Sequence, residues 1–189
     1  LVLRGRLSRA RAVPRMEWPV LEVLWQTRLF PMNPVECVIV DSIRNPTQVL
    51  LSRRSPDDKY WPNAWHHPGG YFGGNMKMGE VIQGILLKEV GAGFKSYLLV
   101  TAANFWNLER DHELSLIIVC ELNPEEPIQV EKGLRWFRFD QDFEGEMPPH
   151  HCLIHQTVRR FFDFRGLLYP ELRERFDILH SVVESDTRS

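Results

Sequence analysis

A glycine-rich stretch followed by two spaced carboxylates is the part of this sequence best suited to chemistry. Gly69, Gly70 and Gly74 precede Glu80, and Glu89 follows nine residues later. Glycines ahead of a helix leave backbone amides open to a phosphate, and the positive end of the helix dipole attracts the same anion. On the glycines alone, an ordinary turn is the simpler explanation. The predicted helix that carries the two carboxylates strengthens the case for a site.

The residues between Gly79 and Gly91 predict the helix that must position these carboxylates. Glu89 falls beside the apolar face, so we expect it to meet a metal ion, an arginine or backbone donors, because an unpaired buried carboxylate costs several kcal/mol. Glu80 falls in the first turn, where its alternative role is to complement the helix dipole, worth about 0.3–1 kcal/mol. Apolar residues recur at helical spacing in this segment, at Val81, Ile82, Ile85, Leu86, Leu87 and Val90.

Two arginines follow a predicted strand just ahead of the glycines. The guanidinium groups of Arg53 and Arg54 are suited to bidentate contact with phosphate. A salt bridge to Asp57 or Asp58 is the alternative, since exposed arginines commonly pair in this way.

Histidines are the remaining candidates for proton transfer. His151 and His155 are separated by four residues, which places them on one face of a helix, and either one is a candidate general base. A solvated loop with a helix cap is the simpler role for each of them. With Cys152 they could bind Zn²⁺, but no fourth ligand is evident. His66 and His67 are adjacent on a predicted strand, so at most one should face a single site, and we favour a structural role for them.

These motifs resemble the Nudix hydrolase family. Gly74, Glu80 and residues 88–90 are similar to the front of the Nudix box, G-x5-E-x7-R-E-U, and residues 50–54 and 65–70 are similar to the strands that precede it. The resemblance implies an α/β (α+β) fold, in which a mixed β-sheet is sandwiched between α-helices. It also implies Mg²⁺ or Mn²⁺ as cofactor, held by Glu80, Glu89 and the carbonyl of Gly70. The backbone of Gly69 to Gly74 would then hold a pyrophosphate.

The sequence also departs from the family pattern. Lys88 stands in place of the box arginine, and Ala92 and Gly93 occupy the positions of two further glutamates, so the box is degenerate. Within the family the chain most resembles the GDP-mannose mannosyl hydrolases, through residues 124–126, Gln129 with Arg135-Trp136, and residues 154–162. That resemblance makes Gln129 a metal ligand. Tyr71, which stands where those enzymes have an arginine, is assigned to substrate binding.

Runs of β-forming residues predict strands over 35–41, 47–52, 96–105, 113–121, 128–131 and 134–139. We divide the chain into a basic arm (1–15), an N-terminal extension (16–34), a Nudix-like domain (35–166) and a C-terminal helix with a tail (167–189). The arm holds five arginines and no acidic residue. We interpret Met16 as the natural start, with a transit peptide or nucleic-acid arm as the alternative.

Composition limits the partners. The formal net charge is −2, and it falls to −7 without the five arginines of the arm, which argues against a nucleic-acid ligand. No apolar run reaches the roughly 18 residues needed to span a bilayer. Three scattered cysteines predict a reducing, cytoplasmic setting. The C-terminal helix is expected to pack on the domain or on a second copy, as in a homodimer.

Two classes of function follow. The first is a hydrolase that cleaves a nucleoside diphosphate linked to another group, such as a nucleotide sugar. The second is a catalytically inactive Nudix-fold module that binds a nucleotide or a protein, which the missing acidic pair favours. Isopentenyl-diphosphate isomerase-like chemistry on the same fold is supported only by the Trp-Pro-Asn-Ala-Trp sequence of residues 61–65.

Overall fold

The computed structural model describes residues 33–71, 76–108, 111–130 and 133–168. The basic arm, almost all of the N-terminal extension, Gly74 and the segment after residue 168 lie outside the described residues. The predictions made for them are therefore not tested. Among the described residues, no helix is both long and apolar enough to cross a membrane.

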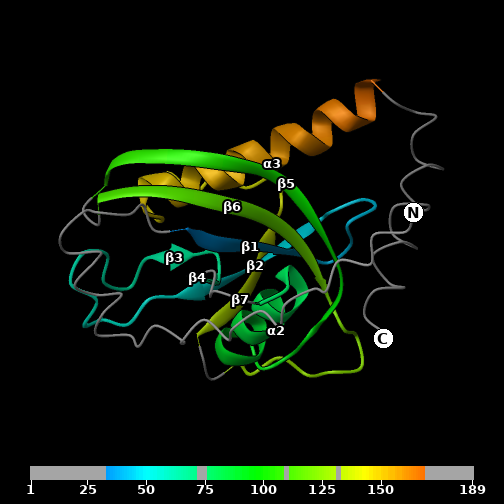
Figure 1. Ribbon diagram of the computed structural model, residues 1–189, viewed down its shortest axis with the longest axis horizontal. Helices are drawn as coiled ribbons and strands as arrows, with labels where there is room; N and C mark the ends of the chain where they lie inside the picture. Colours follow the sequence, from blue (N-terminus) through cyan, green and yellow to red (C-terminus); the bar gives the residue numbers. More distant parts are fainter. Residues whose placement is uncertain (1–32, 72–75, 109–110, 131–132, 169–189) are drawn as a thin grey trace, which may run out of the picture. The chain divides into compact units, whose positions relative to one another are not determined.

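A seven-stranded mixed sheet forms the centre of the domain (Figure 1). Its main path runs in the order β3 (Trp65–His66), β2 (Gln48–Arg53), β1 (Pro34–Val40), β6 (Asp111–Leu122) and β5 (Phe94–Leu108). Two short strands lie off this path: β4 (Gly69–Tyr71) pairs with β1, and β7 (Leu134–Arg138) pairs with β2. The β1–β6 pair is parallel and the other pairs are antiparallel.

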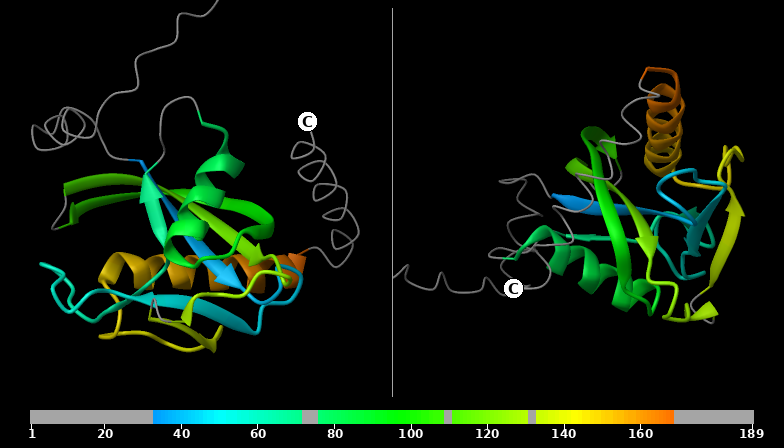
Figure 2. Two further views of the ribbon diagram at one scale, coloured as in Figure 1. Left: turned by 90° about the horizontal axis from the view of Figure 1, so that it is seen from below. Right: turned by 90° about the vertical axis from the view of Figure 1, so that its right-hand side faces the viewer.

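Two helices cover opposite faces of this sheet, α2 (Met78–Glu89) on one face and α3 (Pro149–Leu168) on the other (Figures 1 and 2). Alternation along β1 explains why both faces are apolar, because successive side chains of a strand point to opposite sides. Val35, Cys37 and Ile39 pack toward α2, and Val38 and Val40 belong to the cluster beneath α3. This arrangement confirms the predicted α+β fold.

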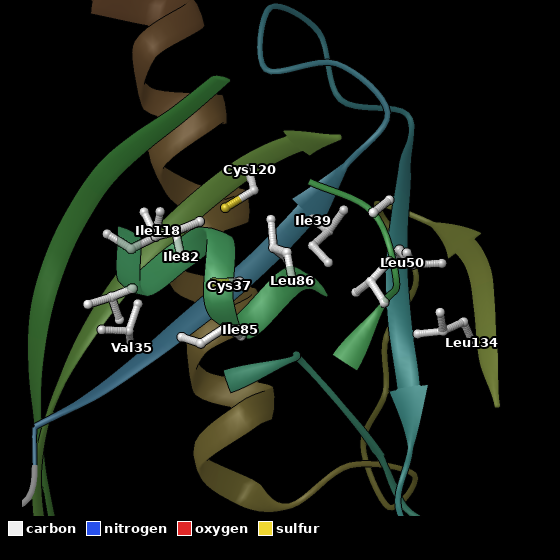
Figure 3. Packing of buried hydrophobic residues seen from close by; sticks show 13 residues of the cluster. Val35, Cys37, Ile39, Leu50, Ile82, Ile85, Leu86, Ile118, Cys120 and Leu134 are labelled. Carbon is white, nitrogen blue, oxygen red and sulfur yellow. The ribbon is translucent and has the colours of Figure 1, made fainter. Parts of the chain in front are cut away.

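Packing of apolar side chains beneath α2 holds that helix against the sheet. Ile82, Ile85 and Leu86 lie against the side chains of β1, as Figure 3 shows. Each fully buried aliphatic side chain stabilises the fold by about 1.5–3 kcal/mol relative to an exposed one. The helix ends at Glu89 because Gly91 adopts φ +86°, and the amides of Val90 and Gly91 both donate to the carbonyl of Leu86.

The strands β1 and β2 are paired over only part of their length, and the gap between them positions the candidate site. The two strands pair only near Ile39↔Leu50 and Val40↔Val49. Beyond that point β1 pairs with β4, and β2 pairs with β3. The sheet therefore opens between the start of β1 and the end of β2, and residues 65–71 line the opening.

Two sequence-based element predictions are wrong. Residues 128–130 do not form a strand, because the amide of Gln129 donates to the carbonyl of Val90 and draws this segment onto the end of α2. The solvated loop considered as the simpler setting of His151 and His155 is not formed. Both histidines lie inside the first turns of α3, which begins at Pro149. Proline suits a first helical position because it lacks the amide that would have no partner there.

Candidate functional site

A cavity of about 170 Å³ opens where β1 and β2 separate. Its wall includes Glu36 from β1, Gly69 and Gly70 from β4, and Glu89 from the end of α2. The other wall residues come from the chain around β3, the ends of β1 and β4, and the first turn of α3: Pro34, Arg54, Tyr60, Trp61, His66, His67, Tyr71, His150 and His151. The site thus combines carboxylates, imidazoles, one guanidinium and the aromatic rings of Tyr60, Trp61 and Tyr71.

A second cavity, of about 390 Å³, shares part of this wall. Arg54, His66 and Glu89 line both cavities. The rest of the second wall is polar and consists of Ser52, Arg53, Ser55, Asp58 and Lys88. A ligand that spans both cavities would therefore pass the three shared side chains.

Gly69 and Gly70 are required by close packing in β4. Gly69 is paired with Glu36 across β1, and a Cβ atom on Gly69 would lie 2.5 Å from Oε2 of that carboxylate. A Cβ atom on Gly70 would lie 3.0 Å from Cγ1 of Ile85. Both glycines lie in β4 and pair with β1, so for these two residues the explanation as an ordinary turn is wrong. The absence of side chains brings the β4 backbone close to the carboxylate.

Arg54 forms the salt bridge that the sequence offered as the alternative to phosphate contact. Its Nη1 lies 3.0 Å from Oδ2 of Asp58, and the same arginine lines both cavities. Burial would raise the pKa of Asp58, but hydrogen bonds from the amides of Trp61 and Tyr60 and from Arg54 outweigh it and lower the pKa to about 2. Asp58 is therefore a fixed anion that holds Arg54 at the site.

Arg53 lies on the outer side of the same segment. Its Nε donates to the carbonyl of Asn63 at 3.1 Å, and its guanidinium lies 5.7 Å from the ring centroid of Trp65. It lines only the second, more polar cavity. Trp65 packs edge to face on Phe137, so it belongs to the core beneath α3.

The side chains of His66 and His67 do not point to opposite faces in the way expected of neighbouring strand residues. Both His66 and His67 line the first cavity, because β3 ends at His66 and the chain turns there. The prediction that at most one of them faces the site is wrong. His67 is fully buried, and neither ring nitrogen makes a hydrogen bond among the described residues. Burial, together with the neighbouring rings of His155 and His66, lowers its pKa well below the ordinary value.

His151 and His155 share one face of α3 but have different surroundings. His151 lines the cavity, with Nδ1 3.9 Å from Oε2 of Glu36. His155 lies farther along the helix and is not in the cavity wall; its Nε2 contacts the carbonyl of Phe139 at 3.0 Å. The assignment of His155 as a catalytic residue is therefore corrected: it packs inside the domain. Burial is the main cause that lowers its pKa to about 4.

The carboxylates of α2 do not come together. Oε2 of Glu80 accepts a hydrogen bond from the amide of Lys77 at 3.0 Å, so Glu80 caps the helix start. Glu89 lies nine residues on, about 13 Å farther along the axis at 1.5 Å per residue. Gln129 folds over Gly91 at the end of the helix, outside both cavity walls. The structure therefore does not assemble the predicted metal set of Glu80, Glu89 and Gln129.

The positions of the missing box glutamates are buried in the turn after α2. Ala92 is fully buried, and a Cβ atom on Gly93 would lie 2.5 Å from Nε2 of Gln83. The amide of Gly93 donates to Glu126 at 2.6 Å, which fixes the turn. Within the part of the chain that the structure describes, no three His, Cys, Asp or Glu side chains converge as ligands for a metal ion. The donor set therefore does not form a closed cation site.

Sequence reasoning missed Glu36. This residue is 8% exposed, although it interrupts the otherwise uncharged strand Pro34–Val40. A single carboxylate within a buried strand is unusual, because burial of a charge requires a partner. This charged residue within an apolar strand is the signal from which Glu36 could have been predicted as a functional residue. Its partner His151 could not be found from the sequence, because 115 positions separate the two residues.

Comparisons with known proteins identify the fold. No protein-family model matches the chain, and no curated protein matches its sequence. Solved structures do match. A NUDIX hydrolase from Nitrosomonas europaea has 14% identity and a TM-score of 0.55, over 69% of this chain and 90% of that one. The MutT protein from Methanosarcina mazei Go1 has 17% identity and a TM-score of 0.55, over 71% and 96%.

A third match carries a ligand. The NUDIX domain of Shewanella oneidensis NrtR, complexed with ADP ribose, has 12% identity and a TM-score of 0.56, over 77% of this chain and 98% of that one. The chain therefore has the fold of the Nudix hydrolases. Identities this low define the fold alone, so the activity must be argued from the site.

Proposed function

We propose that this chain binds the diphosphate of a nucleoside diphosphate derivative and hydrolyses it. The observation that carries the proposal is the convergence of Arg54, Glu89 and His151 on one cavity at the opening of the sheet. These side chains supply a phosphate ligand, a carboxylate and a candidate proton acceptor. The Nudix fold and the ADP-ribose complex of a protein with this fold support the same class of ligand.

Arg54 is the proposed phosphate ligand of the cavity. Its guanidinium lines both cavities, and Asp58 holds it through Nη1. Arginine pairs with phosphate through two parallel hydrogen bonds, which are about twice as strong as bonds between neutral groups. Arg53 and Lys88 in the second cavity would add positive charge beside the group attached to the diphosphate.

The rings of Tyr60 and Trp61 line the first cavity and are suited to stack on a nucleobase, and Tyr71 borders the same cavity. Among the described residues, no Phe, Tyr or Trp side chain lines the second cavity, which is rich in hydroxyl and charged groups. We propose that it receives a polar group such as a sugar. A nucleotide sugar is therefore the first substrate class to test.

A divalent cation fits this site only in part. Mg²⁺ commonly binds through one or two carboxylates together with substrate phosphates, and Glu89 can serve as such a carboxylate. The site therefore fits a cation that arrives with the diphosphate, and not one held by the protein alone. When bound, Mg²⁺ or Mn²⁺ would neutralise charge on the leaving phosphate. Gly70 lines the cavity, so its carbonyl remains a proposed additional ligand.

The test is a hydrolysis screen of the full chain. Nucleotide sugars, ADP-ribose, dinucleotides and nucleoside triphosphates would each be incubated with Mg²⁺, Mn²⁺ or EDTA, and products separated by chromatography. We expect release of a nucleoside monophosphate or diphosphate that EDTA abolishes. Absence of any metal-dependent product across the panel would contradict the hydrolase proposal.

The second candidate is a ligand-binding module without turnover. The burial of Ala92 and Gly93 favours this binding module. Because α2 ends at Glu89, no later residue of the helix can supply the two carboxylates that the Nudix box has at these positions. In that case a nucleotide at a hundred times its dissociation constant would stabilise the fold by about 2.7 kcal/mol in EDTA, with no product formed. Thermal denaturation with ADP-ribose and EDTA separates the two candidates.

Other predicted properties stay predictions. The three cysteines are free thiols, which supports a reducing, cytoplasmic setting. A 27mer DNA is bound in a crystal structure of NrtR, which shares this fold, so the expectation that nucleic acid is not a ligand needs a direct binding measurement. Homodimer formation can be measured by analytical ultracentrifugation.

A further inference from the structure

His151 lies between a carboxylate and a guanidinium in the wall of the first cavity. Its Nδ1 is 3.9 Å from Oε2 of Glu36, and its Nε2 is 3.4 Å from Nη2 of Arg54. The side chain of His151 is 3% exposed and that of Glu36 is 11% exposed. The three groups come from α3, from β1 and from the segment after β2, so the fold itself brings them together.

The contact with Arg54 favours one tautomer of His151. A guanidinium can only donate hydrogen bonds, so Nε2 of His151 must be the acceptor. The neutral ring then carries its proton on Nδ1, which faces the carboxylate of Glu36. Burial first, and then His150, His66, His67 and Arg54, lower the pKa of His151 well below its ordinary value, so the ring is neutral near pH 7.

Arg54 has an edge that fits a phosphate better than it fits the imidazole. Nη1 is held by Asp58, whereas Nε is buried and makes no hydrogen bond among the described residues. Nε and Nη2 lie on the same edge of the guanidinium, and that edge can bind two oxygens of one phosphate. The contact of Nη2 with His151, at 3.4 Å, is near the long limit for a hydrogen bond.

We infer that Arg54 covers the proton-accepting nitrogen of His151 until a substrate phosphate takes the Nε and Nη2 edge, so that substrate binding itself exposes the base. Glu36 is the proposed positioning residue, because its carboxylate faces Nδ1 of the ring across 3.9 Å. This inference rests on the proposed hydrolysis of a diphosphate. It adds a means of keeping the base covered while the cavity holds no phosphate.

The step that follows is an ordinary hydrolysis. A water molecule gives one proton to Nε2 of His151 while its oxygen forms a new bond to phosphorus. The bond from that phosphorus to the bridging oxygen breaks, and the bridging oxygen leaves with the other product. The imidazolium faces Glu36 through Nδ1–H, which stabilises its charge, and it then returns the extra proton to solvent.

The first test observes the ring directly. Imidazole ¹⁵N NMR spectra of the full chain, assigned with His151→Gln, should show Nδ1 protonated and Nε2 unprotonated without ligand. Inorganic pyrophosphate should shift the Nε2 resonance, and Arg54→Met should shift it without ligand. Arg53→Met removes the same charge from the neighbouring position and should leave it unchanged. A ring protonated on Nε2, or a resonance that Arg54→Met does not move, would overturn the inference.

The second test uses the pH dependence of kcat/KM. Loss of the carboxylate lowers the pKa of the imidazolium, so Glu36→Gln should move the acidic limb to lower pH by about one unit or more, and Glu36→Asp should partly restore it. Circular dichroism of both variants controls for folding. An acidic limb that stays in place in Glu36→Gln would overturn the positioning role.

The proposed hydrolysis and the covering role of Arg54 are contradicted by different results. If pyrophosphate and the nucleotide panel are neither bound nor cleaved, the proposed function fails, and the role of Arg54 fails with it. If turnover is measured but pyrophosphate leaves the His151 resonance unmoved, the function stands and the covering role of Arg54 is wrong.

Discussion

Gly69 lies directly across from Glu36 in the antiparallel pair of β4 and β1, and the Oε2 atom of Glu36 occupies the space of the missing Cβ, 2.5 Å from where it would lie. The backbone of β4 and the buried carboxylate are therefore packed as one unit. The position of the Glu36 carboxylate, which faces His151, therefore depends on this glycine.

Gly69→Ala tests that dependence. The added methyl group must displace the carboxylate or the strand, so we expect a loss of about 1–3 kcal/mol in the free energy of unfolding, measured with urea. Gly84→Ala is the matched control, because Gly84 lies within α2 and a Cβ atom there would meet nothing within 4 Å. That change should stabilise the protein by about 0.4–1 kcal/mol. Equal effects of the two substitutions would contradict the packing argument.

The sequence predicted the elements around this site better than the site itself. The strands at 35–41 and 47–52 followed from runs of β-forming residues, and the helix ending near Gly91 followed from helical spacing. Both are local signals. Glu36 and His151 meet only because β1 and α3 pack together, and no local pattern records that contact. The segment 128–130 resembled a strand by composition, but its hydrogen bond to the end of α2 decided otherwise.

We expect that an acidic residue at position 92, where the resemblance aligns a box glutamate, does not create a metal site. Ala92 is fully buried in the core beneath α2, so Ala92→Glu would bury a charge without a partner. We expect a loss of about 3–5 kcal/mol in the free energy of unfolding. Leu87→Glu, at a position of the same helix that is 47% exposed, should change stability by no more than about 0.5 kcal/mol. A stable Ala92→Glu protein with higher Mg²⁺ affinity would show that residue 92 can reach the cavity.

The buried histidines predict a loss of stability in weak acid. The pKa of His155 is lowered to about 4, mainly by burial, whereas an unfolded histidine titrates near 6.5. Above pH 6.5 neither state binds the proton. Between 6.5 and 4 only the unfolded state binds it, so stability falls as the pH falls, by about 3 kcal/mol for this residue. His67 and His151, whose pKa values are also lowered, act in the same direction.

His155→Gln isolates one contribution to that slope. The amide can still donate to the carbonyl of Phe139, but it does not titrate. We expect urea midpoints that depend less on pH between 4.5 and 6.5 than those of the parent protein. Asp58 does not add to this window, because its pKa lies at about 2. An unchanged slope in His155→Gln would mean that His155 is not held neutral in the folded state.

Glu80 and Glu89 provide the sharpest comparison for catalysis, because they belong to one helix and only Glu89 lines the cavities. Glu80→Gln should weaken the helix cap by about 0.3–1 kcal/mol and leave turnover unchanged. Glu89→Gln should lower kcat by roughly two orders of magnitude, the effect expected when a charge-stabilising group is removed from a reacting centre. It should also raise the Mn²⁺ concentration needed for half-maximal rate. The measurement is initial rate against Mn²⁺ concentration for both variants on the best substrate of the panel. If both variants retain full activity, the cation is held without Glu89. If Glu80→Gln alone is inactive, the reaction takes place at the other end of α2. The cavity between β1 and β2 is then not the active site.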